Sequence, residues 1–272
     1  MPTLPNDLNK LLEIFQSKKW NMEEENLFEK FCVAINLLEE DEKDLFFFLT
    51  NKFLKISDID YFPKIKYSVN RIELSPNIKN IIVVPLIKQS DADKVKSSSS
   101  LVYYVKEQLR KKFTNYTIKA YSHYQNITET ITKDTILVFP DDFIGSGTYA
   151  TEFLKELQDK FGATNNVFVT IAILKTGKEY LETLNNNVYS CHILEKGILD
   201  DPTIDTKHKK IYYDVLHKLS QKLGIFATYE KGLYESEALV SLIKIPNNTF
   251  GLYWCESKQT KEKQWPQLFQ RR

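Results

Sequence analysis

The sequence predicts an α/β fold in which a mostly parallel sheet carries helices on both faces and follows an N-terminal helical region. Short unbroken apolar runs recur from residue 80 onward, and this is the pattern of strands buried on both faces of a parallel sheet. Segments of helical periodicity alternate with these runs, which implies right-handed crossovers and a doubly wound sheet. Before residue 75 the apolar residues follow helical spacing.

The N-terminal region is predicted to be helical. Amphipathic patterns cover 7–18, 22–39 and about 42–55, and the third is more apolar than a surface helix needs. No catalytic constellation occurs in 1–75, so a helical layer packed on the sheet is favoured over a partner-docking platform. The expected domains are this region and an α/β domain over 76–272 that ends in a strand pair and a Trp-rich tail.

The first sheet strand is predicted over Asn80–Ile87, followed by the polar stretch KQSDADKVKSSSS. A helix with apolar residues at every fourth position follows from Leu101, and Ser100 is a suitable N-cap. The second strand is predicted over Thr117–Tyr124 and leads into a short connection. His123 in this strand is a minor candidate for a general base, because a lone His is more often packed or exposed.

The chain is organised around ILVFPDDFIGSGTYAT, residues 136–151. Its apolar run is a buried strand whose ladder Pro140 is expected to end. Asp141 and Asp142 then lie at the carboxyl end of the strand, where open α/β sheets bind their ligands. A Gly-Ser-Gly turn follows, and helical spacing from Tyr149 onward predicts a helix that Gly162 ends.

The turn is suited to binding an anion. Gly145, Ser146 and Gly147 allow a tight backbone turn, and Ser146 and Thr148 add hydroxyls. The helix that follows presents free N–H groups at its start, which bind phosphate well. Two carboxylates immediately before such a turn suit a ribose 5-phosphate, since they accept hydrogen bonds from sugar hydroxyls while the helix terminus holds the phosphate.

Beyond the motif, strands are predicted over 167–174 and 188–194, and helices over 176–184 and 206–223. The last part of the chain has an apolar run and an aromatic run, which are read as a strand pair over Ala238–Ile245 and Phe250–Trp254. The intervening Pro-Asn-Asn-Thr sequence is a reasonable turn. The final W-P-x-L-F-x-R sequence is read as a packing anchor.

These motifs carry a family resemblance. The sequence DDFIGSGT resembles the phosphoribosyl pyrophosphate (PRPP) motif of type I phosphoribosyltransferases. More narrowly, together with Pro-Asn-Asn-Thr at 246–249 and the Trp-Pro tail at 265–271, it resembles the phosphoribosyltransferase-like proteins of bacterial conflict and anti-phage systems. The resemblance runs from about Leu45 to the C-terminus. One departure is Tyr149, which stands where many members of the family have a Thr.

The resemblance implies a phosphoribosyltransferase-like sheet that binds PRPP with Mg²⁺ and catalyses phosphoribosyl transfer or hydrolysis. Asp141 and Asp142 would hold the ribose, and the loop from Gly145 to Tyr149 would hold the 5-phosphate. The pyrophosphate would lie at the polar stretch, on Lys94, Lys96, Ser98 and Ser99. Asn247 and Asn248 are candidates for reading a base or a hydroxyl, because side-chain amides both donate and accept hydrogen bonds.

Two other functions stay open. One is a non-catalytic PRPP or nucleotide sensor, or an interaction subunit of a defence complex with protein partners. The short connection after the second strand favours it, because a long catalytic flap is then doubtful. The other is a glycosidase that acts on a phosphorylated ribose and releases a free base.

Composition sets the remaining bounds. The chain has 272 residues and a net charge of +1 from 37 basic and 36 acidic residues, so direct nucleic-acid binding is not expected. The three cysteines form no CxxC pair, and no dedicated metal site is expected apart from Mg²⁺ bound with PRPP. Without a signal-peptide pattern or a long apolar run, the sequence predicts a cytoplasmic protein with no membrane contact. It does not predict an oligomeric state.

Overall fold

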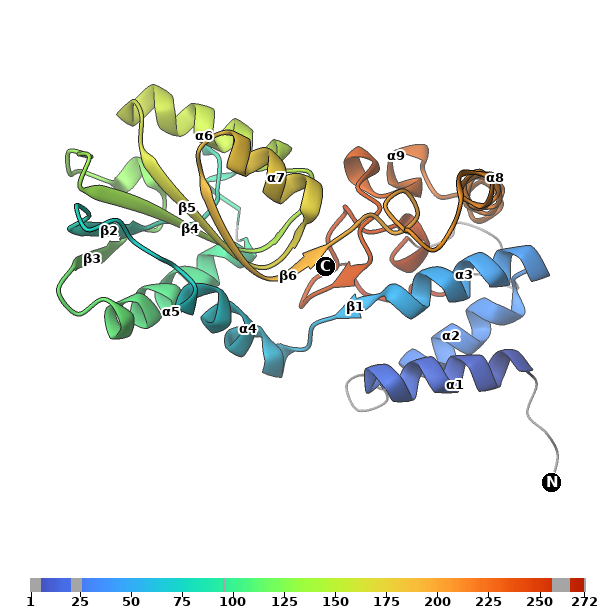
Figure 1. Ribbon diagram of the computed structural model, residues 1–272. Helices are drawn as coiled ribbons and strands as arrows, with labels where there is room; N and C mark the ends of the chain where they lie inside the picture. Colours follow the sequence, from blue (N-terminus) through green and yellow to red (C-terminus); the bar gives the residue numbers. More distant parts are fainter. Residues whose placement is uncertain (1–5, 21–25, 95, 256–264, 272) are drawn as a thin grey trace. The chain divides into compact units, whose positions relative to one another are not determined.

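The computed structural model describes residues 6–20, 26–94, 96–255 and 265–271. They form two compact units, of which one is Asp58–Leu194 and the other combines Met1–Ser57 with Glu195–Arg272. This division differs from the expected 1–75 and 76–272, because the segment after residue 57 groups with the sheet and the segment after residue 194 groups with the N-terminal helices. In Figure 1 the first unit carries β2 to β6, and the second carries α1 to α3, α8 and α9.

The unit of residues 58–194 is built on a parallel five-stranded sheet with the order β3-β2-β4-β5-β6. The strands are β2 (Asn80–Val83), β3 (Thr117–Ala120), β4 (Thr135–Ile144), β5 (Asn165–Leu174) and β6 (Asn187–Leu194). The chain leaves β2 for β3 on one side and then crosses to β4 on the other side of β2. Winding therefore reverses between β2 and β4, and ligands of open α/β sheets bind at such a reversal.

Helices cover both faces of this sheet, as predicted. Figure 1 shows α4 (Asp58–Asn70) and α5 (Ser97–Lys112) on one face, and α6 (Thr148–Phe161) and α7 (Lys175–Thr183) on the other. Aromatic and aliphatic residues of α6 and α7 are buried with those of the strands in one apolar cluster. The α/β class with a mostly parallel sheet is confirmed. Helix α4 is not among the predicted elements.

The first two strands of the sheet along the chain, β2 and β3, are shorter than predicted. Strand β2 ends at Val83 rather than near residue 87. One more ladder bond follows, from the Val84 N–H to the Val138 oxygen at 3.0 Å. The next residue, Pro85, has no N–H to donate, so the ladder stops there. Strand β3 pairs only with β2, and its last partner pair is Val83 and Ala120. It therefore ends with β2.

The expectation that Pro140 ends the ladder of β4 is wrong, because the strand continues to Ile144. Pro140 is paired with Val169 of β5. The carbonyl of Val138 accepts a hydrogen bond from the N–H of Val84, on the β2 side. Backbone groups two residues apart in a strand point the same way, so the nitrogen of Pro140 also faces the β2 side, at a level beyond the end of β2. A missing N–H costs little there. The acidic pair is consequently held inside a strand.

Helix α5 begins earlier than predicted. Its first residue is Ser97 and its N-cap is Lys96, so the expectation of Ser100 as N-cap is wrong. The Ser100 hydroxyl instead donates to the carbonyl of Ser97 inside the first turn, at 2.7 Å. The serine run is therefore helical rather than a loop.

The second unit is mainly helical. Its helices are α1 (Asn6–Lys18), α2 (Leu27–Asn36), α3 (Glu40–Lys52), α8 (Thr206–Leu223) and α9 (Ala227–Glu230). The predicted helix over 22–39 includes residues 22–25, which lie outside the described residues. The strand pair predicted near the C-terminus is wrong: β7 (Val240–Ser241) pairs in parallel with β1 (Leu54–Lys55), and a 3₁₀ turn occupies Gly251–Tyr253. Among the described residues, no helix is both long and apolar enough to cross a membrane.

The Trp-Pro tail is a packing element of this second unit. Trp265, Leu268 and Phe269 are at most 2% exposed. The indole N–H of Trp265 donates to the Leu252 carbonyl at 2.9 Å, and the backbone N–H of Phe269 donates to Tyr253 at the same distance. The tail thus anchors itself on the 3₁₀ turn, in agreement with the packing role predicted for it.

Candidate functional site

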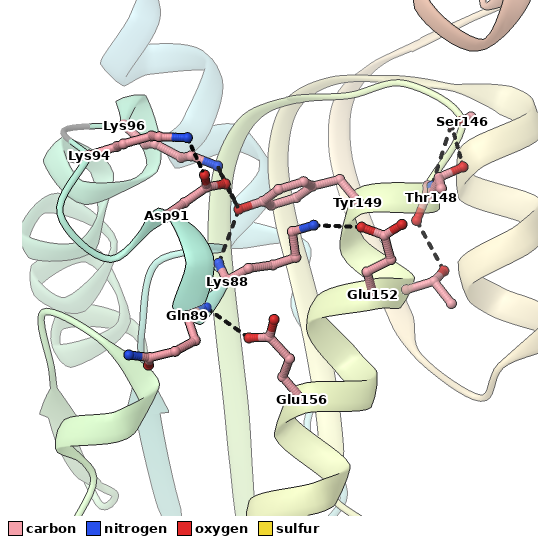
Figure 2. A network of polar contacts seen from close by, with 12 residues as sticks. Lys88, Gln89, Asp91, Lys94, Lys96, Ser146, Thr148, Tyr149, Glu152 and Glu156 are labelled. Atoms are coloured by element: carbon pink, nitrogen blue, oxygen red, sulfur yellow. Dashed lines mark hydrogen bonds and ion pairs between the residues drawn. The ribbon is translucent and has the colours of Figure 1, made fainter.

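The segments that follow β2 and β4 meet at the point where the winding of the sheet reverses. Residues 84–96 follow β2 and lead into α5, and residues 145–147 follow β4 and lead into α6. Figure 2 shows side chains of both segments in one network of polar contacts. Asp141, Asp142 and most of the predicted binding residues lie in or next to these two segments.

The acidic pair is partly buried and has a tyrosine partner. The backbone N–H of Asp142 donates to Oδ1 of Asp141 at 3.0 Å, and the Tyr61 hydroxyl of α4 donates to Oδ2 of Asp142 at 2.8 Å. Burial, and then the charge of Asp142, raise the pKa of Asp141 well above its usual range. Two adjacent, poorly hydrated carboxylates gain from any hydroxyl donor or cation placed between them. Sequence reasoning missed Tyr61, whose only signal is an aromatic residue in an unpredicted helix.

The Gly-Ser-Gly turn has the conformation that its sequence predicts. Gly147 is the N-cap of α6 and has φ +83°, a left-handed conformation that favours glycine. The hydroxyls of Ser146 and Thr148 lie 2.9 Å apart, and the Thr151 hydroxyl donates to the Gly147 carbonyl at 3.0 Å. The start of α6 has no acidic residue in its first turn, so its N–H groups face no competing carboxylate of that turn.

Gly177 of α7 supports this turn, and sequence reasoning missed it. A Cβ atom on Gly177 would lie 2.0 Å from the Gly145 carbonyl oxygen and 3.2 Å from the Gly147 nitrogen. Only a residue without a side chain lets the first turn of α7 lie this close to the backbone of the turn. Its signal in the sequence is a glycine inside a helical pattern, which indicates close backbone approach.

Tyr149 connects the start of α6 to the segment after β2 (Figure 2). Its hydroxyl accepts the backbone N–H of Lys88 at 3.0 Å and donates to Oδ2 of Asp91 at 2.8 Å. Asp91 also pairs with the ammonium groups of Lys94 (2.7 Å) and Lys96 (2.6 Å). Burial raises the pKa of Tyr149, so the hydroxyl remains protonated. Lys94 and Lys96 thus lie near the start of α6, and both are paired with Asp91.

Two glutamates of α6 hold the same segment. Lys88 pairs with Glu152 at 2.6 Å, and the backbone N–H of Gln89 donates to Glu156 at 2.8 Å. The Tyr124 hydroxyl donates to Glu156 as well, at 2.9 Å. Because residues 149, 152 and 156 are three and four positions apart, they lie on one face of the helix. The segment after β2 is therefore docked along α6.

The predicted serines lie in the first turn of α5 rather than in a loop. Ser98 is 1% exposed, and its hydroxyl has no hydrogen-bond partner within the described part of the chain. Ser99 is exposed, and its N–H donates to the Lys96 carbonyl at 3.1 Å. The start of α5 still directs N–H groups toward the segment that carries the lysines.

His123 is 9% exposed and packs beside Tyr124, with ring centroids 4.6 Å apart. Its Nδ1 accepts the backbone N–H of Gln125 at 3.2 Å. This burial agrees with the packed role that was preferred for it.

Asn247 and Asn248 belong to the other compact unit. The side-chain amide of Asn248 donates to the Ser236 hydroxyl at 2.8 Å and to the Leu233 carbonyl at 3.3 Å. The carbonyl of Asn247 accepts the N–H of Leu233 at 2.7 Å. Asn248 therefore shapes a turn of that unit through its side chain, and Asn247 does so through its backbone. A ligand role for the two residues stays a prediction.

A family model described as PRTase-CE, a phosphoribosyltransferase-like domain, matches residues 39–271 of the chain. The comparison with curated proteins gives no match. Among solved structures, the AQ2163 protein from Aquifex aeolicus matches at 13% sequence identity, over 64% of this chain and 86% of that chain. Its TM-score is 0.31.

Proposed function

The chain belongs to the PRTase-CE family of phosphoribosyltransferase-like domains, and we propose that it binds PRPP or a related phosphoribosyl nucleotide together with Mg²⁺. One observation carries the proposal: a carboxylate pair, a glycine-capped helix start and a lysine-bearing segment meet at the reversal of a parallel sheet. Each part suits one part of a phosphoribosyl ligand.

The 5-phosphate is assigned to the start of α6. The free N–H groups of the first turn and the hydroxyls of Ser146 and Thr148 are suitable donors for its oxygens. Gly147 lets the turn pack closely against α7, because a Cβ there would lie 3.3 Å from the Gly177 carbonyl oxygen and from the Tyr180 ring. The ribose is assigned to Asp141 and Asp142, which accept from its 2- and 3-hydroxyls.

The pyrophosphate is assigned to Lys94, Lys96 and the first turn of α5, where Ser98 contributes its backbone N–H and the exposed Ser99 its hydroxyl. Ammonium groups and backbone N–H groups share the load of a highly charged anion well. The tie from Tyr149 to Asp91 fixes this segment against α6, so the two anion-binding parts are held on one rigid support.

The residues present are compatible with Mg²⁺ as a companion of the ligand. Mg²⁺ is usually bound by one or two carboxylates together with substrate phosphates. Asp141 and Asp142 supply such a pair. Burial and the charge of Asp142 raise the pKa of Asp141, so a bound cation would favour its charged form. No group of three or more His, Cys, Asp or Glu residues suited to a metal occurs among the described residues, so the ligand would supply the remaining oxygens. Bound Mg²⁺ would neutralise charge on the pyrophosphate.

The reaction that this arrangement supports is phosphoribosyl transfer or hydrolysis. The bond between the anomeric carbon and the pyrophosphate oxygen breaks, and the carbon becomes cationic before an acceptor or water bonds to it. Asp141 and Asp142 place negative charge near that centre, and the lysines stabilise the leaving pyrophosphate. Catalysis would consist mainly of positioning and electrostatic stabilisation.

A second candidate function is a PRPP or nucleotide sensor without turnover, acting as a subunit of a bacterial defence system with protein partners. The connection between β3 and β4 favours it. Glu129 in this connection accepts hydrogen bonds from Lys119 and Tyr121, which hold it against the edge strand. A connection tied down in this way is a poor candidate for a catalytic flap.

Calorimetric titration with PRPP and Mg²⁺ tests the proposal. The test variant is the double substitution Asp141→Asn/Asp142→Asn. The control is Asp159→Asn, which makes the same Asp-to-Asn change at an exposed position of α6. Saturable binding by the wild type and the control, lost in the double variant, is the expected result. Phosphorus NMR of the same mixture then separates the two functions, because release of pyrophosphate marks turnover and its absence favours the sensor. Binding that the double variant retains would contradict the role of the acidic pair.

A further inference from the structure

The two lysines assigned to the pyrophosphate are already paired with an anion of the protein. Asp91 binds Lys94 through Oδ1 at 2.7 Å and Lys96 through Oδ2 at 2.6 Å. Its side chain is 14% exposed, and that of Lys96 is 27% exposed. Figure 2 shows the carboxylate between the lysines and the Tyr149 hydroxyl. The carboxylate thus occupies the position in which a phosphate oxygen would meet these ammonium groups.

We propose that Asp91 is an internal competitor for the anionic ligand, which must displace its carboxylate from Lys94 and Lys96 to bind. This inference rests on the proposed function and adds a selectivity device to the same site. An ammonium group has three N–H donors, and two of those of Lys96 already serve Asp91 and the Tyr149 hydroxyl. While the carboxylate stays, a phosphate oxygen finds one donor of Lys96 left and is repelled by the negative charge of Asp91.

Tyr149 holds the competitor in place. Its hydroxyl accepts the Lys88 N–H, which leaves its own hydrogen for Asp91. The ammonium of Lys96 also lies over its ring, 4.0 Å from the centroid, a favourable cation–π contact. The hydroxyl at the end of the aromatic ring of Tyr149 reaches from α6 to this segment.

The charge state of Asp91 supports the inference. Hydrogen bonds from Lys94, Lys96 and Tyr149 hold the pKa of its carboxyl well below the usual range. The group is therefore an anion at neutral pH, where the ligand's phosphates are charged too. A multiply charged pyrophosphate is the ligand class best able to displace it, because it offers several oxygens to the same two lysines.

The test is a calorimetric titration of the full chain with inorganic pyrophosphate and with PRPP, each with Mg²⁺. Asp91→Asn is compared with wild type and with Asp93→Asn, which removes an equal charge at an exposed position two residues further on. We expect Asp91→Asn to bind both probes about fivefold more tightly, the equivalent of one partly exposed ion pair. Asp93→Asn should differ from wild type by less than about twofold, because exposed charges are screened.

A double-mutant comparison separates competition from a general effect of charge. In a Lys94→Gln/Lys96→Gln background, Asp91→Asn should no longer tighten binding beyond the effect of Asp93→Asn. Tightening that persists without the lysines would overturn the inference. Thermal melting checks each variant, and Asp91→Ser replaces Asp91→Asn if the latter lacks a cooperative transition.

The outcomes distinguish this inference from the proposed function. Binding of PRPP by wild type with equal or weaker binding by Asp91→Asn overturns the inference and leaves the proposed function standing. Binding by Asp91→Asn alone supports the inference in its strongest form. No binding of either probe by any variant overturns both.

Discussion

The hydroxyl of Tyr61 donates a 2.8 Å hydrogen bond to Oδ2 of Asp142, across 81 positions of the sequence. Tyr61 is 3% exposed, and burial together with the Asp142 charge raises its pKa, so it remains a protonated donor. The bond fixes the carboxylate relative to α4, a helix whose sequence carries no catalytic pattern. Helix α4 is consequently part of the site as well as a cover for the sheet.

Tyr61→Phe tests this support. Removing the hydroxyl leaves a partly buried carboxylate without its donor, and bonds to charged groups contribute about 1.5–3 kcal/mol. We expect a loss of about 1–2 kcal/mol in the free energy of unfolding by urea, and weaker PRPP binding because Asp142 is less well oriented. Tyr67→Phe, at a 52% exposed tyrosine of the same helix, is the matched control. Equal unfolding midpoints for the two variants would show that the bond contributes nothing.

Asp141→Asn is expected to stabilise the protein at neutral pH. The folded-state pKa of Asp141 is raised, so the folded chain binds a proton more readily than the unfolded chain. Stability is therefore lost as the pH rises from the unfolded value, about 4, through the folded value. Asparagine removes this loss.

The expected result is a higher Tm for Asp141→Asn at pH 7 and no difference from wild type below about pH 4. A gain of 1 kcal/mol raises Tm by about 2–4 °C in domains of 150–250 residues. Thermal melts at both pH values give the answer, with the exposed Asp159→Asn as control. A variant that is less stable than wild type at pH 7 would show that the charged form is stabilised by its surroundings.

Gly177→Ala should disturb the phosphate turn from a neighbouring helix. Alanine is about 1 kcal/mol better than glycine inside a helix, yet its Cβ would lie 2.0 Å from the Gly145 carbonyl oxygen. The backbone must move, so we expect a lower unfolding midpoint and at least tenfold weaker PRPP binding. Thr176→Ala, at the exposed preceding residue, controls for the change to alanine. Unchanged binding by Gly177→Ala would mean that the close approach of α7 does not position the turn.

Features set by neighbouring residues could be predicted from the sequence. The strand before Asp141, the tight Gly-Ser-Gly turn and the start of α6 depend on local backbone preferences, and all three are found. The effect of Pro140 on the ladder depends on where β2 ends, which the residues next to Pro140 do not reveal. The serine run has the composition of a loop, although Ser98 is buried inside α5.

Features set by long-range contacts could not be predicted. Tyr61, Gly177 and Asp91 meet the motif only after the chain has folded, and each is an ordinary residue in its own segment. The amide of Asn248 is consumed by Ser236 and Leu233, which a composition-based reading of Asn-Asn cannot foresee. Tyr149 is an intermediate case. Its difference from the family motif can be seen in the sequence, but its hydrogen bond to Asp91 cannot.

Phe269→Ala tests the packing role of the Trp-Pro tail. Phe269 is 2% exposed and stacks on Phe53, with ring centroids 4.8 Å apart and an interplanar angle of 8°. Truncating a buried phenylalanine lowers the free energy of unfolding by about 3–5 kcal/mol, because transfer free energy is lost and a cavity remains.

The three tryptophans, Trp20, Trp254 and Trp265, all belong to the same unit as Phe269, so their fluorescence reports on this unit directly. We expect a lower urea midpoint with red-shifted emission, while Gln270→Ala at the exposed next residue behaves as wild type. A urea midpoint of Phe269→Ala equal to that of wild type would show that packing of the tail does not stabilise this unit.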